Sequence, residues 1–206
     1  MNGTLRVRQG LLCLLIVVAA TAPLLAQSAK EAPRFALSVA AGVTHPAQAA
    51  VRDVYGGRLT PVTVALRCRL RPPLFVFGGW QFLRQGGDTT IVGPQVIDER
   101  YPVRLTMSSV RAGAGVAVPW RRWIFSAGAG LAYTTFDERW TAGDLSTGGH
   151  SYGYLAQAAG EFLLHRRFGI VGRIEYVAVP IPTATAGRSG LDLGGLSVSG
   201  GAAVRF

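Results

Sequence analysis

Cysteine and lysine are almost missing from this sequence, and each scarcity excludes a class of protein. Only Cys13 and Cys68 occur, and Cys13 lies in an N-terminal apolar run that we expect to be removed. A chain left with one thiol has no internal disulfide, so its stability must come from elsewhere. Lys30 is the sole lysine, and the net charge of +10 rests on scattered arginines. Scattered arginine in an exported chain argues against nucleic-acid binding.

Charge and long apolar segments are scarce as well. Charged residues make up 16% of the chain, against about 25% in a typical soluble domain. Glycine is abundant, with 27 of 206 residues, and the mean hydropathy is +0.29. After the first thirty residues, no run approaches the roughly 20 apolar residues of a transmembrane helix. This combination is typical of a membrane protein built as a closed sheet, in which every strand is paired.

The N-terminus has the pattern of an export signal. Arg6 and Arg8 precede the apolar run "LLCLLIVVAA" at 11–20, and small residues follow at 22–29. This order is typical of a cleaved secretory signal peptide, and a membrane anchor that is kept is the alternative. We expect a signal peptide at 1–26, with the cleavage boundary within 26–29, and one domain at 27–206. Cys13 follows a leucine rather than a small residue, so no lipid anchor is expected there.

The rest of the chain repeats a segment of about ten residues in which apolar and small or polar residues alternate. Strict alternation with a period of two predicts half-buried strands. It occurs at 35–43, 62–70, 123–135, 151–164, 168–179 and 191–206. The segment 74–84 is apolar on both sides. In 102–118 the apolar positions change from odd to even numbers, and we expect a β-bulge near Ser108-Ser109 to restore the phase.

The breaks between these eight segments alternate in length. Short breaks fall at 71–73, 119–122 and 165–167, and long breaks at about 44–58, 85–101, 137–150 and 180–190. Tight turns on one side and long loops on the other are typical of outer-membrane barrels. The sequence therefore predicts an all-β fold, an eight-stranded antiparallel up-and-down transmembrane β-barrel, with both ends of the barrel domain on the short-turn side.

The contents of the two strand faces favour a membrane barrel over a soluble barrel or a sandwich. The face opposite the apolar one consists mainly of Gly, Ala, Ser and Thr, which suits the crowded lumen of a small barrel. Its few charges form a predicted luminal cluster: Arg67, Arg69, Arg111, Glu161, Arg173 and Glu175. Aromatic residues gather near both ends of the strands, as in the girdles of spanning barrels. They are Trp120, Trp123, Phe125 and Phe168 near the short turns, and Tyr133, Tyr152, Tyr154 and Tyr176 near the long loops.

The last strand carries a further pattern, in which Ser199, Gly201, Val204 and Phe206 form a polar-x-Gly-x-x-apolar-x-aromatic series. This series resembles the C-terminal assembly signal of bacterial outer-membrane barrels, although Val204 stands where an aromatic residue is sometimes found. With the signal peptide and eight strands, the chain resembles the small eight-stranded barrels of the OmpA, OmpX and OmpW type, as a barrel-only member. The resemblance implies export to the outer membrane of a Gram-negative-type bacterium and insertion by the outer-membrane assembly machinery.

Two roles follow from this interpretation. We expect a structural or surface-interaction protein whose lumen is largely filled by side chains, with a narrow channel for small solutes as the alternative. Five arginines in the short turns form a basic rim that would contact anionic lipids: Arg71, Arg121, Arg122, Arg166 and Arg167. Partners are then outer-membrane lipids, including lipopolysaccharide, and the protein is expected to be a monomer that binds no nucleic acid.

Catalytic and metal sites find little support. A lipid A deacylase, which is also an eight-stranded barrel, uses His, Ser and Glu, so His150, Ser151 and Glu161 form the candidate set for a lipid A-modifying hydrolase. Adjacent residues of a strand point to opposite faces, and Glu161 lies ten residues further along, so these three cannot form a triad. The carboxylates Asp137, Glu138 and Asp144 match no calcium loop. We therefore predict no catalytic residue, cofactor or metal site.

Overall fold

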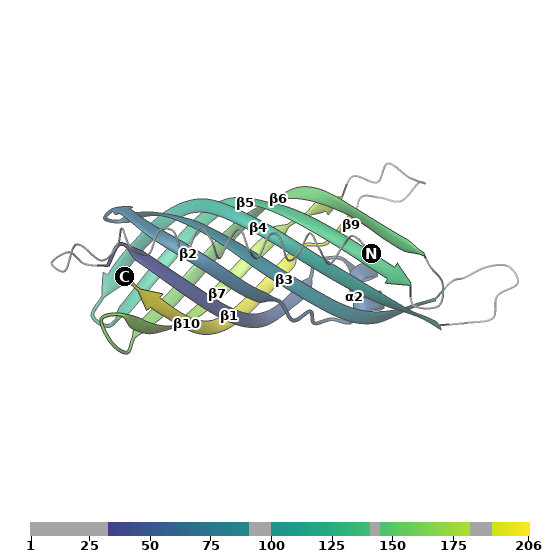
Figure 1. The fold of residues 1–206 in the computed structure, drawn as a ribbon, viewed down its shortest axis with the longest axis horizontal. Coiled ribbons are helices and arrows are strands. Elements are labelled where there is room, and N and C mark those ends of the chain that lie inside the picture. Colours follow the sequence, from purple (N-terminus) through teal and green to yellow (C-terminus); the bar gives the residue numbers. More distant parts are fainter. Residues whose placement is uncertain (1–32, 91–99, 141–144, 182–190) are drawn as a thin grey trace, which may run out of the picture.

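A computed structural model describes residues 33–90, 100–140, 145–181 and 191–206. Eight long strands close into one antiparallel barrel, in the order β1-β10-β7-β6-β5-β4-β3-β2 (Figure 1). They are β1 (Phe35–Pro46), β2 (Val62–Arg71), β3 (Leu74–Thr90), β4 (Arg100–Trp120), β5 (Trp123–Trp140), β6 (Ser146–Leu163), β7 (Phe168–Ala178) and β10 (Gly195–Arg205). The predicted up-and-down barrel is confirmed. The predicted signal peptide lies outside the described residues.

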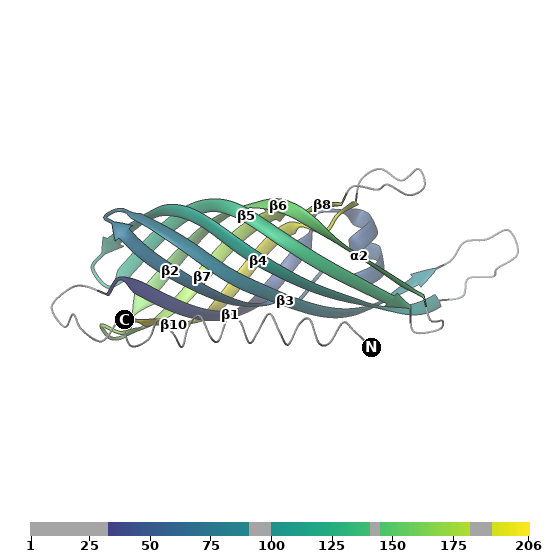
Figure 2. The same cartoon turned by 45° about the horizontal axis from the view of Figure 1, so that its top comes forward.

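Three smaller elements lie at one end of the barrel (Figures 1 and 2). The helix α2 (Ala49–Tyr55) follows β1, and the short strands β8 (Pro180–Ile181) and β9 (Leu191–Asp192) pair with each other. Among the described residues, no helix has the length and apolar character needed to cross a membrane. The long loop predicted at about 44–58 is therefore wrong at Ala49–Tyr55, where the chain is helical.

The barrel closes where the first and last strands meet. Ala36 pairs with Arg205, and the register continues without interruption to Pro46 and Gly195. Phe35 and Phe206 exchange two backbone hydrogen bonds of 2.9 and 3.0 Å, and their rings stack with centroids 5.9 Å apart. Closure gives each of the eight barrel strands a partner on both sides. The C-terminus, where this contact between Phe35 and Phe206 is made, lies at the end of the barrel that carries the short turns (Figure 1).

The strands are longer than the sequence pattern indicated. Pairing of β3 with β4 continues to Thr90 and Arg100, and pairing of β5 with β6 to Arg139 and Ser146. The predicted loops are therefore wrong at 85–90, 100–101, 137–140 and 146–150, which are strand residues, whereas 91–99 and 141–144 lie outside the described residues. The polar residues that resembled a loop are compatible with a strand, because a hairpin outside the apolar band needs no alternating apolar face.

The predicted bulge in β4 is also wrong. Ser108 pairs with Phe82 and Thr135, and Ser109 with Gln81 and Thr134, without any register shift. Odd-numbered residues of β4 face the lumen throughout. Val103 and Leu105 are therefore buried luminal residues, with 2% and 1% exposure, whereas the following apolar residues face outward. The pattern changes because the contents of the lumen change along the strand.

The outer face is apolar between two aromatic zones. Exposed aliphatic side chains include Val39, Val110, Val116, Leu131, Ile170, Ile174 and Val198. Near the short turns, the rings of Trp123 and Phe125 stack 5.8 Å apart. Toward the other end, the rings of Tyr133 and Tyr152 lie 5.1 Å apart. All eight aromatic residues predicted for the two zones are exposed, which gives the outer surface the organisation of a spanning barrel.

Candidate functional site: the luminal side chains

The luminal side chains form layers of different chemistry, and the layer nearest the short turns is ionic. Glu161 on β6, with 2% exposure, receives two arginines from other strands. Arg67 on β2 lies 2.5 Å from its Oε2, and Nε of Arg205 on β10 lies 2.8 Å from its Oε1. One carboxylate thus links β6 to β2 and β10, the two strands that lie on either side of β1.

Aromatic rings and glycines fill the space beside this ionic layer. Phe75 on β3 is buried, and the guanidinium of Arg67 lies 5.7 Å from its ring centroid, a cation–π arrangement. Phe77 lies against Gly113 so closely that a Cβ on Gly113 would come within 2.5 Å of its ring. The small residues on the luminal face therefore make room for large ones, which is the packing that a narrow barrel requires.

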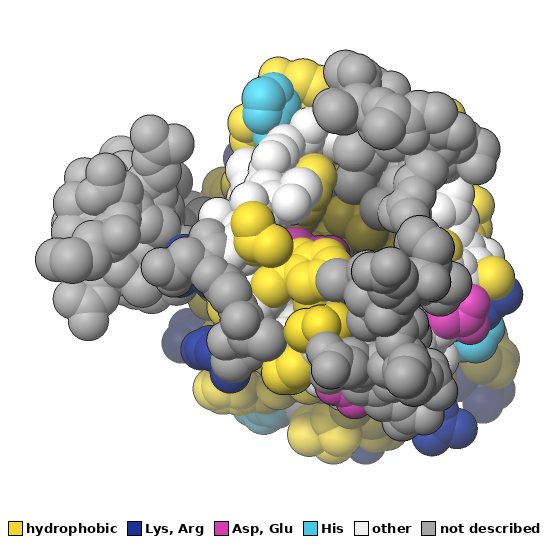
Figure 3. Space-filling model, turned by 90° about the vertical axis from the view of Figure 1, so that its right-hand side faces the viewer, with side chains coloured by type: hydrophobic (Ala, Val, Ile, Leu, Met, Phe, Trp, Pro, Cys, Tyr) yellow, Lys and Arg dark blue, Asp and Glu magenta, His cyan; other side chains and the backbone are white. Residues whose placement is uncertain are grey.

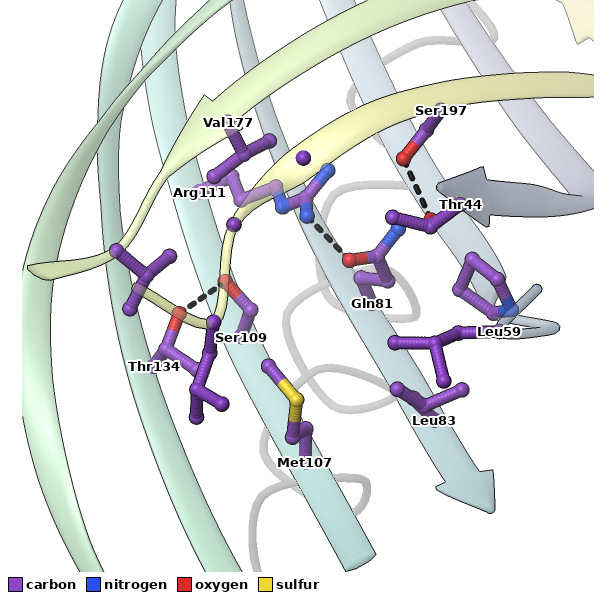
Figure 4. A pocket seen from close by; sticks show the side chains of 15 residues that line it. Thr44, Leu59, Gln81, Leu83, Met107, Ser109, Arg111, Thr134, Val177 and Ser197 are labelled. Atoms are coloured by element: carbon purple, nitrogen blue, oxygen red, sulfur yellow. Dashed lines mark hydrogen bonds between the residues drawn. The ribbon is translucent and has the colours of Figure 1, made fainter. Parts of the chain in front are cut away.

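A second ionic layer lies near the middle of the barrel. Arg111 on β4 forms a buried salt bridge with Glu175 on β7 and donates a further hydrogen bond to the side-chain oxygen of Gln81 on β3 (Figure 4). Arg111 and Glu175 are 7% and 5% exposed. A buried charge that loses its partner is costly, so this network ties the neighbouring strands β3 and β4 to β7 across the lumen.

Arg173 on β7 lies between the two ionic layers without a carboxylate bound to it. Within the described residues it makes one long hydrogen bond, 3.5 Å from Nη2 to the hydroxyl of Ser38 on β1. Its buried Nε has no hydrogen-bond partner among the described residues. The charges that act on it are those of Glu175, Arg111 and Arg67. The arginines Arg67, Arg111, Arg173 and Arg205 therefore face two glutamates, which leaves an excess of two positive charges.

Beyond the second ionic layer, neutral polar pairs lead into an apolar layer. Thr134 donates to Ser109 over 2.9 Å, and Thr44 and Ser197 share a hydrogen bond of 2.6 Å (Figure 4). The apolar layer then occupies the barrel end opposite the short turns. Its buried members are Val51, Tyr55, Leu59, Leu83, Val103, Leu105, Ala132, Leu155, Val177, Val179 and Leu193.

The helix α2 covers this apolar layer. It buries Val51 and Tyr55, and Arg52 holds the helix to the end of β1 by donating to the carbonyls of Pro46 and Ala47, each over 2.9 Å. The hydroxyl of Tyr55 donates to Glu138 on β5 over 2.5 Å. Burial, together with the adjacent Glu138 carboxylate, raises the pKa of Tyr55. Seen along the barrel axis from this end, hydrophobic side chains gather at the centre (Figure 3).

Small cavities lie among the luminal side chains of the described residues, and two of them bear on the ionic layers. One of about 50 Å³ lies between the ionic layers and is lined by Ser38, Arg67, Arg111, Gln157, Glu161, Arg173 and Glu175, among others. The other, of about 30 Å³, lies between the second ionic layer and the apolar layer (Figure 4). Arg111 lines both cavities and separates them.

The other predicted residues lie at the short-turn end. Arg69 is exposed at the end of β2, two residues beyond Arg67 on the same face. The five rim arginines are exposed, and the guanidinium of Arg121 lies 5.6 Å from the ring centroid of Trp120. On β10, Val204 and Phe206 are exposed on the outer face. Ser199 and Gly201 lie on the luminal face, where a Cβ on Gly201 would meet the backbone of Val39.

Three parts of the lumen were missed at the sequence level. Arg205 shares the strand face of Ser197 and Ser199 and could have joined the predicted cluster on that signal alone. Gln81 lies in a segment that is apolar on both sides, so its face was not assigned. The helix α2 left no signal, because seven residues without a capping side chain or a first-turn acid give too weak a pattern.

The three candidate catalytic residues have different partners and surroundings. His150 is exposed and its ring lies beside that of Tyr133, whereas Ser151 is buried and donates to the carbonyl of Pro180. Glu161 is held by its two arginines in the first ionic layer. In the described part of the chain, no group of three His, Cys, Asp or Glu side chains could hold a metal ion.

Of the acidic loop residues, Asp137 pairs with Arg139 over 2.9 Å and Glu138 accepts the bond from Tyr55. Asp144 lies outside the described residues.

A closed antiparallel barrel of eight strands with an apolar exterior and an ion-paired lumen defines the class: the chain has the fold of the small outer-membrane barrels. Comparison with solved structures agrees. The chain is similar to the outer membrane protein OprG from Pseudomonas aeruginosa, with a TM-score of 0.63 and 12% identity over 85% of this chain and 97% of that one. It is also similar to Neisserial surface protein A (NspA), with a TM-score of 0.58, 11% identity and coverage of 84% and 97%.

A third similar structure is Ail, the attachment invasion locus protein of Yersinia pestis, crystallised in complex with the heparin analogue sucrose octasulfate. Its TM-score is 0.53, with 14% identity over 84% of this chain and 97% of that one. No family model and no curated protein matches the sequence. At these identities the likeness establishes the fold, and the role of this chain rests on its own residues.

Proposed function

We propose that this chain is exported by its N-terminal signal, spans the outer membrane of a Gram-negative-type bacterium as a monomer, and serves a structural or surface-interaction role. The short turns and the C-terminal end of β10 would face the periplasm, and the long hairpins and α2 would face outward. Insertion by the outer-membrane assembly machinery, and contact with lipids that include lipopolysaccharide, are part of this proposal. Its supports are the apolar outer face with two aromatic zones and the fold shared with outer-membrane proteins.

The filled lumen carries the proposal for a structural rather than a conducting role. A solute crossing the barrel would have to pass the Glu161 layer, the Arg111–Glu175 layer and the apolar layer under α2. An eight-stranded barrel has room for little beyond its own side chains. Opening such a path would require charged pairs to separate inside the barrel, which is costly.

Planar-bilayer recording tests this proposal. The purified wild-type barrel should give no steady single-channel current. The double variant Arg67→Ala/Glu161→Ala removes one ionic layer but leaves Arg111, Glu175 and the apolar layer, so it should also remain silent. A steady current through the wild-type protein would overturn the filled-lumen role.

A narrow channel for small solutes is the second candidate. The observation that favours it is the pair of cavities on either side of Arg111, together with the excess of arginine over glutamate between the ionic layers. Such a channel would select anions. In bilayers under a salt gradient, the reversal potential would then have the sign of anion flow, and Arg173→Glu would reduce or invert it.

The basic rim supports the proposed contact with lipids. Its arginines are exposed in the turns after β2, β4 and β6, and no acidic residue accompanies them there. Attraction to an anionic surface contributes about 1 kcal/mol per basic residue. In nanodiscs, the thermal stability of the wild-type barrel should rise with the fraction of anionic lipid. The variant Arg121→Gln/Arg122→Gln should show a smaller rise, and an identical rise would contradict the contact.

The surface-interaction role has its own test. Shortening the connection between β5 and β6 should leave the barrel folded, as judged by heat-modifiable migration in gel electrophoresis. Attachment of expressing cells to host-cell or abiotic surfaces should fall in proportion to the hairpin removed. If attachment is unchanged after each outward connection has been shortened in turn, the surface-interaction role is contradicted and only the structural role stands.

A further inference from the structure

The polar chamber between the two ionic layers has an imbalance of charge that the protein's own carboxylates do not remove. Four arginines, Arg67, Arg111, Arg173 and Arg205, face the two carboxylates of Glu161 and Glu175. Each carboxylate is already bonded to at least one arginine other than Arg173. Of these four arginines, Arg173 is the one with no salt bridge to either glutamate, and it lines the cavity of about 50 Å³.

The same chamber also contains hydrogen-bond donors without acceptors. Nε of Arg173 and Nε of Arg111 are buried and have no acceptor among the described residues. Arg111 is nearly fully buried, and it too lines the chamber. Buried guanidinium groups normally have all their donors satisfied, because an unpaired buried donor costs free energy. The chamber thus offers unused N–H donors and positive charge together.

The neutral groups around the chamber are suited to a small anion. The amide of Gln157 lines it and can donate hydrogen bonds. The hydroxyls of Ser38 and Ser126 also line it, and donate long hydrogen bonds of 3.3 and 3.5 Å to backbone carbonyls, from which they could turn to an anion. A cavity of this volume accommodates an ion of a few heavy atoms but no metabolite of ordinary size. The bidentate geometry of guanidinium favours oxyanions, and its charge also favours halides.

The chamber also has an approach from the short-turn end. Side-chain exposure rises outward along the first ionic layer, from 3% at Glu161 to 15% at Arg205 and 20% at Arg67, and Arg69 beyond them is exposed. Arginines thus border the path from the barrel end to Arg173. Positive charge along a narrow path raises the local concentration of anions.

We propose that the chamber binds a small inorganic anion, chloride, phosphate or sulfate, at the guanidinium of Arg173 with Arg111 beside it. The anion would offset the excess charge of the lumen and accept the unused donors. It would be a bound component of the folded barrel rather than a transported solute. The site requires only the folded lumen, so it stands whether or not the barrel conducts or binds a surface partner.

The test uses the full barrel, refolded in detergent and dialysed into gluconate, an anion too large for the chamber. Chloride, phosphate or sulfate is then titrated at low millimolar concentration and constant ionic strength. A ligand that binds only the folded state raises the unfolding midpoint as its concentration exceeds the dissociation constant. At about five times that constant, we expect a rise of about 2–4 °C for a chain of this size.

Arg173→Gln should abolish this rise, because it removes the charge and the Nε donor. The matched control is Arg104→Gln, which removes one exposed arginine of β4 outside the chamber and should retain the full response. The three anions are titrated separately, so the response identifies the species. No rise with any of them, or the same rise in Arg173→Gln, would overturn the proposal.

A second measurement needs no variant and covers the case in which Arg173→Gln does not fold. In the wild-type barrel labelled with ¹⁵N-arginine, the anion that binds should shift at least one Nε–H resonance along a saturable curve. Exposed rim arginines should show only small, linear shifts. Linear shifts for every arginine would refute the site.

Discussion

The hydroxyl of Tyr55 on α2 donates a hydrogen bond of 2.5 Å to the carboxylate of Glu138 on β5. Eighty-three residues separate the two in sequence, and the bond fastens the helix to a strand that lies far from β1 around the barrel. Together with the burial of Val51, it keeps the helix seated over the apolar layer of the lumen.

This bond should make the stability of the folded protein depend on pH. The pKa of Tyr55 is raised by burial and by Glu138, whereas an unfolded tyrosine ionises near pH 10. The stabilising contribution is therefore complete below about pH 10 and is lost as the pH rises further, because the unfolded side chain loses its proton first. In a spectroscopic titration of the tyrosines, one should resist ionisation beyond the ordinary range.

The variant Tyr55→Phe should remove that late-titrating tyrosine, whereas Tyr154→Phe, on the exposed outer face, should leave it in place. Hydrogen exchange at neutral pH should be faster in α2 of Tyr55→Phe and unchanged in the barrel strands. If the late titration survives in Tyr55→Phe, the assignment to this bond is wrong.

The central ionic layer should dominate the stability of the lumen. Glu175→Ala leaves the guanidinium of Arg111 buried with only Gln81 as a partner. Breaking a buried pair in this way costs about 3–5 kcal/mol. We expect a correspondingly lower free energy of unfolding and faster unfolding in detergent with urea.

The control for this variant is Asp137→Ala, which breaks the exposed pair with Arg139 and should cost at most about 1 kcal/mol. Equal losses in Glu175→Ala and Asp137→Ala would show that the luminal pair contributes no more than a surface one.

Because Glu161 pairs with both Arg67 and Arg205, we expect the stability effects of substituting these two arginines to be strongly coupled. Either Arg67→Ala or Arg205→Ala leaves the carboxylate with one partner, and the double variant leaves it with none. The loss in the double variant should exceed the sum of the single losses, because only there does Glu161 become an unpaired buried charge. A double-mutant cycle on the free energy of unfolding measures this excess. A strictly additive result would mean that each arginine acts independently.

The outer face should tolerate charge according to position. Ile174 is 55% exposed on β7 between the two aromatic zones, whereas Leu145, 67% exposed, directly precedes β6 at the far end. Arginine on the lipid face of a barrel costs about 2–4 kcal/mol near the midplane and little near the interfaces.

Folding in lipid bilayers should therefore be destabilised by Ile174→Arg and unaffected by Leu145→Arg. Equal stability of these two variants would mean that Ile174 does not face hydrocarbon.

Much of the fold was predictable because a two-sided strand records its surroundings in its alternation. Phe35 to Val43 and Trp123 to Tyr133 show which face meets the apolar medium, and the lengths of the breaks give the topology. The signal failed in β4, where alternation continued while the lumen changed from polar at Arg111 to apolar at Leu105. A pattern of apolar and polar residues cannot separate a shift of register from a change in what the face contacts.

The sequence by itself determined the eight strands, their alternating connections and the face on which the luminal charges lie. Only the tertiary structure decided which charges meet: Glu161 with Arg67 and Arg205, Glu175 with Arg111, and Arg173 with neither. It also placed α2 over the apolar layer. The reason is geometric, since partners across a lumen lie on strands far apart in sequence, and their heights along the axis are fixed by the register with which the barrel closes.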